Sequence, residues 1–266
     1  MIYVFIPCRL DREVIPTCYD LVQKSDNPNE IKIIVFNQDR KEDMFYQDLF
    51  PEQVTLINID YRKFSNICWI RSLANYFIEP NFKYYLSIDS HMRFDRSWDT
   101  QLIKTLKPNS VLSAYPPPYQ LYGNFEKSYG HYTNDFNRNR VGGFPFITVF
   151  SKDIEEDYKK STIAAGFHFT TIDWLVNVGY DNHLCWGYEE IDLTYRTISK
   201  GYDIINYKNT PIYHLYDKRA RKIEDHAEIF LVNCKEHFKS KLNQIDTLKI
   251  NDYYDIDFNN FIKEFI

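Results

Sequence analysis

The sequence of 266 residues predicts an α/β protein with a mostly parallel central sheet. Apolar segments with the composition of strands alternate with segments of helical periodicity over residues 1–115, which is typical of consecutive βαβ units. Polar residues follow the apolar segments, as Asp89 and His91 follow residues 84–88. In open α/β sheets ligands bind beyond the carboxyl ends of the strands, so these positions are the first candidates for a functional site.

Local patterns predict each element of the first half. Runs of β-branched and aromatic residues predict strands, and apolar residues three or four apart predict amphipathic helices. The strands are expected at residues 2–6, 31–36, 54–59, 84–88 and 111–115, and the helices at residues 13–23, 68–77 and 98–106. The alternation stops at Pro116-Pro117-Pro118, because three prolines fit neither a helix interior nor a central strand.

The second half carries weaker patterns. Antiparallel strands are expected within residues 142–150, a helix over residues 189–200, and short strands at residues 204–207 and 212–214. Gly201 is expected to end the helix as a left-handed residue. The last 50 residues predict one or two helices with an apolar stripe, formed by Ile229, Phe230, Val232 and Phe238. No linker separates the halves, so we expect one continuous core.

Composition excludes several function classes. The net charge of −5 argues against a general nucleic-acid binder, which needs a basic face. No apolar run approaches the roughly 20 residues that cross a bilayer, and residues 1–7 have the pattern of a buried strand rather than a signal peptide. The five cysteines form no C-x-x-C pair, which is typical of free thiols in a reducing compartment. We therefore expect a cytoplasmic protein.

Asp89 and His91 have the chemistry of a divalent metal site. Two residues apart on an extended chain, they can point the same way and share one ion. A carboxylate and an imidazole suit Mn²⁺ or Mg²⁺ beside phosphate oxygens, so the ion is expected to hold the pyrophosphate of a nucleotide. His214, at the end of the expected strand 212–214, is the best candidate for a third ligand. The alternative is that these histidines simply cap strands.

A second candidate group lies in the segment Cys185-Trp186-Gly187-Tyr188-Glu189-Glu190. Both glutamates begin the expected helix, where the helix dipole favours carboxylates, so a purely structural role is the alternative. A carboxylate beside a tryptophan at the mouth of a cleft suits a sugar, because the first binds hydroxyls and the second covers a ring face.

Several basic residues are candidates for neutralising a diphosphate leaving group. Arg9 follows the first expected strand, Arg62 follows the third, and Arg71 lies in the helix expected over residues 68–77. A further cluster follows His214 and consists of Lys218, Arg219, Arg221 and Lys222. For most of that cluster, the alternative is a solvated surface.

The ordered motifs resemble one known family. They are Ile6-Pro7 with Arg9, Asp60-Tyr61-Arg62, Cys68-Trp69-Ile70-Arg71-Ser72-Leu73, Ile88-Asp89-Ser90-His91-Met92-Arg93-Phe94, Trp98-Asp99, Ser113-Ala114-Tyr115-Pro116 and Tyr213-His214-Leu215-Tyr216. The series is similar to the cytosolic hydroxyproline N-acetylglucosaminyltransferases and their microbial relatives over about residues 1–220. The resemblance implies a GT-A fold with a mixed sheet, in which residues 1–115 form the nucleotide-sugar half and residues 116–220 the acceptor half. Residues 221–266 are then expected to form a C-terminal helical extension packed on the core.

The resemblance also implies an activity. It implies a retaining, metal-dependent transferase that moves a sugar, most often GlcNAc, from a UDP-sugar to a hydroxyl of a protein or glycan, with Mn²⁺ or Mg²⁺ as cofactor. By this likeness Asp89, His91 and His214 ligate the metal. The positions expected to bind the nucleotide-sugar are Pro7, Arg9, Asp60, Arg62, Arg71, Asp89, Ser90, Trp186 and Arg219.

The segment from Trp186 to Glu189 is also similar to the W-G-G-E segment of the mucin-type GalNAc-transferases. There the glutamate lies beside the donor sugar and the acceptor. Glu189, Glu190 and Asp89 are therefore the expected catalytic residues.

The chain departs from the family pattern in two places. The family's Pro-Ser-Tyr-Arg-Asp segment is Pro7-Cys8-Arg9-Leu10-Asp11 here, which displaces the arginine by one residue, and residues 118–183 match the acceptor half more loosely. Alternatives therefore stay open. They are an inverting transferase with Glu190 or Asp192 as general base, a non-catalytic sugar- or nucleotide-binding relative, and a structural protein.

Overall fold

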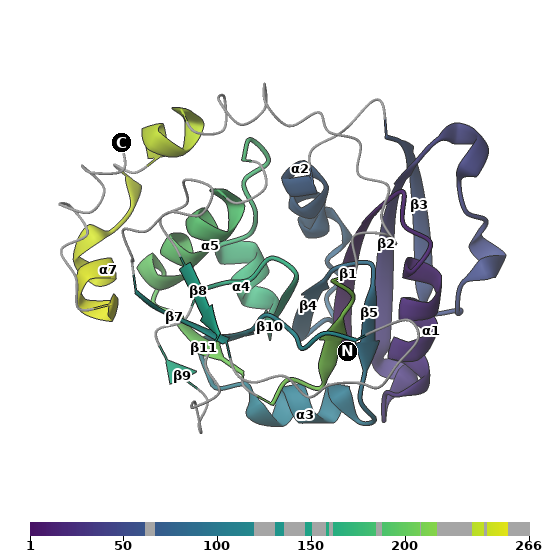
Figure 1. Ribbon diagram of the computed structural model, residues 1–266, viewed down its shortest axis with the longest axis horizontal. Helices are drawn as coiled ribbons and strands as arrows, with labels where there is room; N and C mark the ends of the chain where they lie inside the picture. The colour runs from purple at the N-terminus through teal and green to yellow at the C-terminus, as the bar shows by residue number, and fades with distance from the viewer. Residues whose placement is uncertain are drawn as a thin grey trace.

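The structure is a computed structural model in which an eight-stranded sheet carries helices on both faces (Figure 1). The residues that it describes are 1–61, 67–119, 131–135, 147–150, 158–159, 162–184, 188–207, 209–216, 236–241 and 244–254.

The strand order of the central sheet is β3-β2-β1-β4-β10-β6-β11-β9. These strands are β1 (Ile2–Arg9), β2 (Ile31–Asp39), β3 (Val54–Asp60), β4 (Tyr84–Ile88), β6 (Ser110–Ser113), β9 (Tyr158–Lys159), β10 (Phe167–Thr171) and β11 (Asp203–Asn206). The first four in chain order pair in parallel, and β11 is parallel to β6. Only β10, between β4 and β6, and the short β9 at the edge are antiparallel to their described neighbours. The predicted mixed, mostly parallel sheet is confirmed.

Two small antiparallel sheets and the helices complete the described fold. One sheet pairs β5 (Met92–Phe94) with β12 (Ile212–His214), and the other pairs β7 (His131–Asp135) with β8 (Ile147–Phe150). The helices are α1 (Val14–Gln23), α2 (Ile67–Ser72), α3 (Trp98–Thr105), α4 (Ile172–Asn177), α5 (Tyr188–Ser199) and α7 (Thr247–Tyr254). Residues 236–241 are also helical. Short 3₁₀ turns are η1 (Pro28–Glu30), η2 (Lys41–Asp43), η3 (Gln47–Leu49) and η4 (Leu73–Phe77).

The side chains of β1 divide the core into two layers. Val4 and Ile6 pack in one cluster with residues of α1 and α3, whereas Tyr3 and Phe5 pack in the other with residues of α2, α4 and α5. Successive side chains of a strand point to opposite faces, and a sheet covered on both sides therefore needs apolar residues at every position. This explains why the N-terminal strand has a continuous apolar sequence rather than an alternating one.

Most elements predicted for the first half are present, with small shifts at their ends. The helix predicted over residues 68–77 is α2 followed by the 3₁₀ turn η4. The strand predicted at residues 111–115 is β6, which begins one residue earlier and ends two residues earlier. The short strands β5, β7, β9 and β10 and the helix α4 were not predicted. β10 runs directly into α4 without an intervening turn, so the usual Gly, Pro or Asn boundary signal is missing there.

The second half contains α5, β11 and β12 close to the predicted positions. Gly201 has the expected left-handed φ of 82°, its N–H donates to the Ile198 carbonyl at 2.8 Å, and the Tyr202 N–H donates to the Thr197 carbonyl at 3.1 Å. This pair of bonds is a Schellman motif, in which glycine avoids the steric cost of a positive φ.

The helical C-terminal residues contact the core in the described part of the chain. Phe238 is buried, and its ring lies 5.5 Å from that of Tyr188 and 6.5 Å from that of Tyr195 on α5. The rest of the expected apolar stripe (Ile229, Phe230 and Val232) and residues 142–146 lie outside the described residues.

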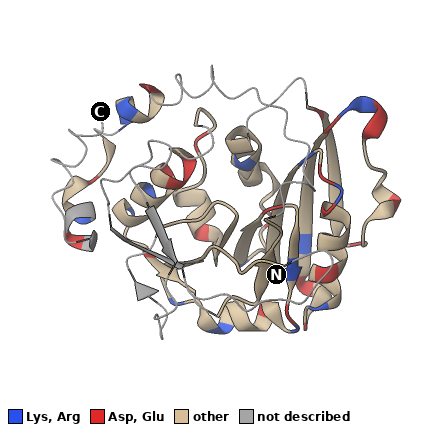
Figure 2. Ribbon diagram, viewed as in Figure 1, with Lys and Arg blue, Asp and Glu red and all other residues tan. Residues whose placement is uncertain are grey.

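Acidic and basic residues are interspersed along the described ribbon (Figure 2). Within the described ranges, no helix combines the length and apolar composition that crossing a bilayer requires. Cys8 and Cys18 are buried thiols outside any disulfide.

Candidate active site

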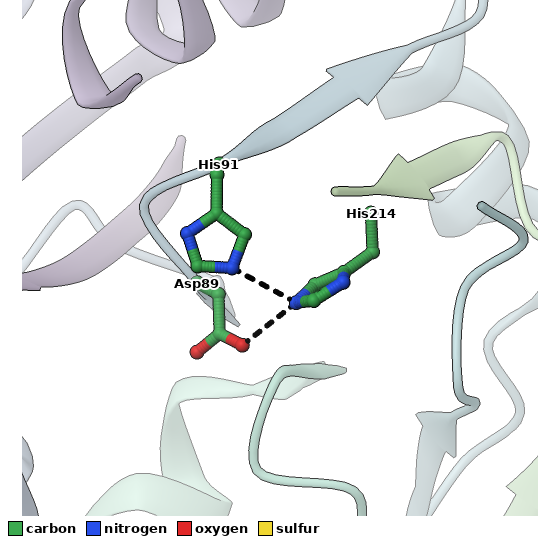
Figure 3. A group of neighbouring side chains, drawn as sticks. All are labelled: Asp89, His91 and His214. Atoms are coloured by element: carbon green, nitrogen blue, oxygen red, sulfur yellow. Dashed lines mark hydrogen bonds and ion pairs between the residues drawn. The ribbon is translucent and has the colours of Figure 1, made fainter. Parts of the chain in front are cut away.

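Three predicted residues converge beyond the carboxyl end of β4. Asp89 follows β4 directly, and its backbone N–H donates to the Gly166 carbonyl at 3.2 Å. His91 precedes β5, and His214 ends β12, which pairs with β5 in the register His214↔Met92. The small β5–β12 sheet therefore brings residues 123 positions apart into one site (Figure 3).

The donor atoms of these three side chains fit a cation. His214 Nε2 lies 3.1 Å from Asp89 Oδ2 and 3.0 Å from His91 Nε2, and the three ligand atoms lie within 4.8 Å of one another. Both histidine side chains are 8% exposed, whereas the Asp89 side chain is 27% exposed and so faces solvent in part. A carboxylate oxygen and two imidazole nitrogens are a common set of ligands for divalent transition metals.

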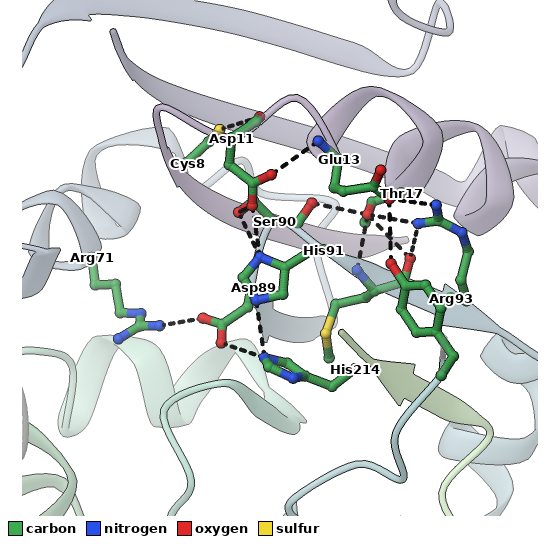
Figure 4. A network of polar contacts seen from close by, with 12 residues as sticks. Cys8, Asp11, Glu13, Thr17, Arg71, Asp89, Ser90, His91, Arg93 and His214 are labelled. Atoms are coloured by element: carbon green, nitrogen blue, oxygen red, sulfur yellow. Dashed lines mark hydrogen bonds and ion pairs between the residues drawn. The ribbon is translucent and has the colours of Figure 1, made fainter. Parts of the chain in front are cut away.

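Asp11 determines which nitrogen of His91 is available to a cation. The Asp11 carboxylate lies 2.6 Å from His91 Nδ1 and accepts a second bond of 2.6 Å from Ser90 Oγ (Figure 4). We assign the proton of the neutral imidazole to Nδ1, because a carboxylate accepts there, which leaves the lone pair of Nε2 directed at His214. A carboxylate behind a ligating histidine is the usual outer-shell partner in metal sites.

Arg71, which was expected to neutralise a diphosphate, forms ion pairs with two carboxylates in the structure. Its Nη1 donates to both oxygens of Glu189 at 3.0 and 2.9 Å, and its Nη2 donates to Asp89 Oδ1 at 3.1 Å. Arg71 and Glu189 are each only 2–3% exposed, so this is a buried ion pair between α2 and α5. The guanidinium thereby holds one oxygen of Asp89 and leaves the other oxygen facing His214.

Electrostatics keep Asp89 ionised. Burial alone raises the pKa of its carboxyl, but the His214 bond and the charge of Arg71 lower the pKa more, so the net shift is well below the usual range. The site therefore presents an anionic oxygen at any physiological pH.

Glu190, next to the ion pair, has a different environment. Its carboxylate accepts from the Ala165 N–H at 2.8 Å and from the Tyr115 hydroxyl at 3.2 Å. Burial has the largest effect and raises the pKa of Glu190. The hydrogen bond from Ala165 lowers this pKa and the charge of Glu189 raises it, and the net result is a pKa of about 7. Asp192 is instead held by Arg196, whose Nε donates at 2.7 Å, and by Lys241.

Two backbone features allow these groups to come close. A Cβ added to Gly166 would lie 2.9 Å from Asp89 Oδ2, so glycine is needed there for β10 to begin beside the carboxylate. Leu10 has a φ of 51°, in the left-handed region that non-glycine residues rarely adopt. Leu10 follows the last residue of β1 and precedes Asp11, so the strained turn brings that carboxylate under His91.

The expected nucleotide positions that fall within the described residues lie along the same edge of the sheet. Pro7 and Arg9 belong to the last three residues of β1, and Asp60 ends β3, where it is in register with Asp39 of β2. The Arg9 guanidinium carbon lies 5.8 Å from the centre of the Tyr61 ring. The structure also brings Ser90 and Arg71 to the Asp89 site, whereas Arg62, Trp186 and Arg219 lie outside the described residues.

Asp11 and Gly166 were not among the predicted site residues. Asp11 lies just after β1, at the same carboxyl end of the strand that made Arg9 a candidate, so its position could have indicated a role in the site. Gly166 had no such signal, because its role depends on β10 lying next to β4.

Comparison with known proteins gives the fold and family. The structure resembles that of TarS from S. aureus with a TM-score of 0.56 and 11% sequence identity, over 92% of this chain and 40% of that chain. A TarS 1–349 structure in complex with UDP-GlcNAc matches with a TM-score of 0.53 and 12% identity, over 92% of this chain and 67% of that chain. GalNAc-T7 with UDP, GalNAc and Mn²⁺ matches with a TM-score of 0.54 and 13% identity, over 95% and 58% of the two chains. No curated protein sequence matches.

The fold is therefore that of the GT-A glycosyltransferases, as predicted. Residues 45–245 match the family model described as "Glycosyltransferase (GlcNAc)", which covers most of the chain. This protein belongs to that family of glycosyltransferases.

Proposed function

We propose that the protein is a metal-dependent, retaining glycosyltransferase that moves GlcNAc from UDP-GlcNAc to a hydroxyl group of a protein or glycan. The observation that carries the proposal is the convergence of Asp89 Oδ2, His91 Nε2 and His214 Nε2 on one point, with Asp89 ionised. The structures of TarS 1–349 with UDP-GlcNAc and of GalNAc-T7 with UDP, GalNAc and Mn²⁺ support the donor class.

Asp89, His91 and His214 are the residues that would hold Mn²⁺ or Mg²⁺. An ion bound there supplies Lewis-acid stabilisation to the departing diphosphate. Asp11 orients His91, and Arg71 orients Asp89 through a bond to the oxygen that faces away from His214.

The remaining predicted residues are proposed to bind the nucleotide and the sugar. Arg9 and Asp60 lie at the carboxyl edge of β1 and β3, where a uridine diphosphate would lie in an α/β sheet. Glu189, fixed by Arg71 and buried, would contribute negative charge that stabilises the positive charge at the anomeric carbon. In a retaining reaction the acceptor attacks from the leaving-group face, and an oxygen of UDP takes its proton.

The test is release of UDP from a panel of UDP-sugars, with Mn²⁺ and with EDTA. Mn²⁺-dependent hydrolysis of UDP-GlcNAc in preference to the other donors is the expected result. Because some transferases need their acceptor, binding of UDP is measured in parallel by thermal shift. No turnover together with no Mn²⁺-dependent UDP binding contradicts the proposal and favours a non-catalytic relative.

An inverting transferase is the second candidate, and the environment of Glu190 favours it. A pKa raised to about 7 suits a general base at neutral pH. NMR assignment of the anomeric configuration of the transferred sugar distinguishes the retaining from the inverting transferase. The donor's α configuration is kept by a retaining transferase and becomes β with an inverting one. Glu190→Gln then abolishes transfer only in the inverting case.

The division at residues 115 and 220 stays a prediction from the family resemblance, and the cytoplasmic location stays a prediction from the sequence.

A further inference from the structure

A second Asp-x-His group lies outside the candidate active site. Asp181 and His183 lie in the turn between α4 and α5, and His237 lies on the helix of residues 236–241. Asp181 Oδ1 is 3.3 Å from His183 Nδ1, and Asp181 Oδ2 is 3.1 Å from His237 Nε2. The ligand atoms of the three side chains lie within 4.8 Å of one another, as in the Asp89 group.

The arrangement is open on one side. The His183 side chain is 69% exposed and that of His237 is 31% exposed, whereas Asp181 is only 13% exposed. The two imidazole rings lie 4.9 Å apart and 35° from parallel, and both side chains are partly exposed to solvent. A cation can therefore reach the nitrogen atoms from solvent, and solvent can supply a fourth ligand.

The carboxylate at the base of the group is held in place by its contacts. Asp181 Oδ1 accepts from the His183 backbone N–H at 2.8 Å, and Asp181 Oδ2 contacts the Lys241 ammonium group. Asp181 thus offers oxygens in fixed positions between two imidazoles.

Lys241 is a competing cation at this position. Its ammonium group contacts Asp181 Oδ2, but it also donates to Asp192 Oδ1 at 2.9 Å. Asp192 is 1% exposed and in turn bonds Arg196. Lys241 therefore keeps a buried ion-pair partner when another cation takes its place on Asp181.

We propose that Asp181, His183 and His237 form a second divalent-cation site, which prefers zinc and is independent of the Asp89 site. Two imidazoles, one carboxylate and one water are a frequent zinc set. The proposed Asp89 site has the same protein donors, but there the diphosphate oxygens would complete the oxygen-rich shell that Mn²⁺ and Mg²⁺ prefer, and the proposed function places no diphosphate at Asp181. An ion there joins the helix of residues 236–241 to the turn that leads into α5, the helix that carries Glu189.

The test uses the full chain, free of any affinity tag, in a His214→Ala background that disables the Asp89 group. Co²⁺ serves as a spectroscopic probe because tetrahedral Co²⁺ absorbs strongly in the visible range, and Zn²⁺ competition then gives the affinity. The expected result is one ion per chain, displaced by Zn²⁺ in preference to Mn²⁺.

Three variants in this background localise the site. His183→Ala, at an exposed position that leaves the core intact, weakens Zn²⁺ binding at least tenfold, and His237→Ala does the same. Lys241→Met removes the competing ammonium and tightens Zn²⁺ binding. Unchanged Zn²⁺ affinity in both histidine variants, or no stoichiometric Co²⁺ spectrum at all, overturns the proposal.

Discussion

Asp11 and His91 are joined by a contact of 2.6 Å between a carboxylate oxygen and Nδ1, although 80 residues separate them in the sequence. The left-handed turn at Leu10 carries Asp11 back under the loop after β4. Within the proposed function, Asp11 is therefore a positioning residue that acts through the histidine.

Asp11→Asn is expected to weaken Mn²⁺ affinity about 10- to 100-fold, as loss of outer-shell partners does in other metal sites. The substitution keeps the shape of the side chain but removes the charge that stabilises the Nδ1–H tautomer. Isothermal titration with Mn²⁺ measures the effect, and Asp43→Asn, at an exposed carboxylate, is the matched control. Equal Mn²⁺ affinity of the Asp11 variant and the wild type would show that Asp11 does not support the ligand.

Arg71→Met is expected to lower the free energy of unfolding by about 3–5 kcal/mol, because it leaves the buried carboxylate of Glu189 without its ion-pair partner. Adding Glu189→Gln removes the unpaired charge and restores most of that stability. Urea unfolding of both variants measures the difference. If the double variant is no more stable than the single one, the buried charge of Glu189 is not the cause of the loss.

Gly166→Ala is expected to abolish Mn²⁺ binding while the fold survives, because the added methyl group meets Asp89 Oδ2 at 2.9 Å. Gly201→Ala is the matched control. It strains a φ of 82° and costs about 1 kcal/mol, but nothing lies within 4 Å of the new methyl group. Titration with Mn²⁺ and thermal unfolding of both variants separate a local clash from general destabilisation. Normal Mn²⁺ binding by Gly166→Ala would contradict the close approach.

His168 is expected to make stability depend on pH below neutrality. The ring is fully buried, and its Nε2 lies 2.7 Å from the Tyr180 hydroxyl. Burial is the largest cause that lowers the pKa of His168, the charge of Arg71 adds to it, and the resulting pKa is about 3. The unfolded chain takes up this proton near pH 6.5, so the histidine's contribution to stability is present above pH 6.5 and is lost as pH falls toward 3. The loss is at most about 1.4 kcal/mol per pH unit.

His168→Gln removes the titrating group and therefore removes this part of the pH dependence. The stability advantage of the wild type over the variant should shrink when urea unfolding is moved from pH 7 to pH 5. A constant difference across that range would mean that His168 is not the group that titrates.

The first half of the fold could be predicted because its signals are local. The apolar runs of β1, β2 and β4 are continuous, and each is closed by turn or polar residues. β10 could not be predicted in the same way. Its five residues are held between β4 and β6, and that placement depends on pairing with distant strands rather than on its own sequence.

In the candidate site, too, the residues with local signals could be predicted, whereas contacts between distant segments could not. Asp89 and His91 were found from their position after a strand, and His214 was found because it also ends one. The contacts of Arg71 were not foreseen, because a lone arginine in a helix gives no sign of the two carboxylates that reach it from α5 and from the loop after β4.

The pairing of β5 with β12 also has a consequence for the order of events during synthesis. Residues 91 and 214 are 123 positions apart, which at translation rates of about 5–20 residues per second corresponds to roughly 6–25 s. A nascent chain that has released β4 therefore presents two of the three proposed ligands before the third exists. Under the proposed function, stable binding of a cation would wait until β12 emerges, so the ion would be acquired late, after residues 1–115 have been made.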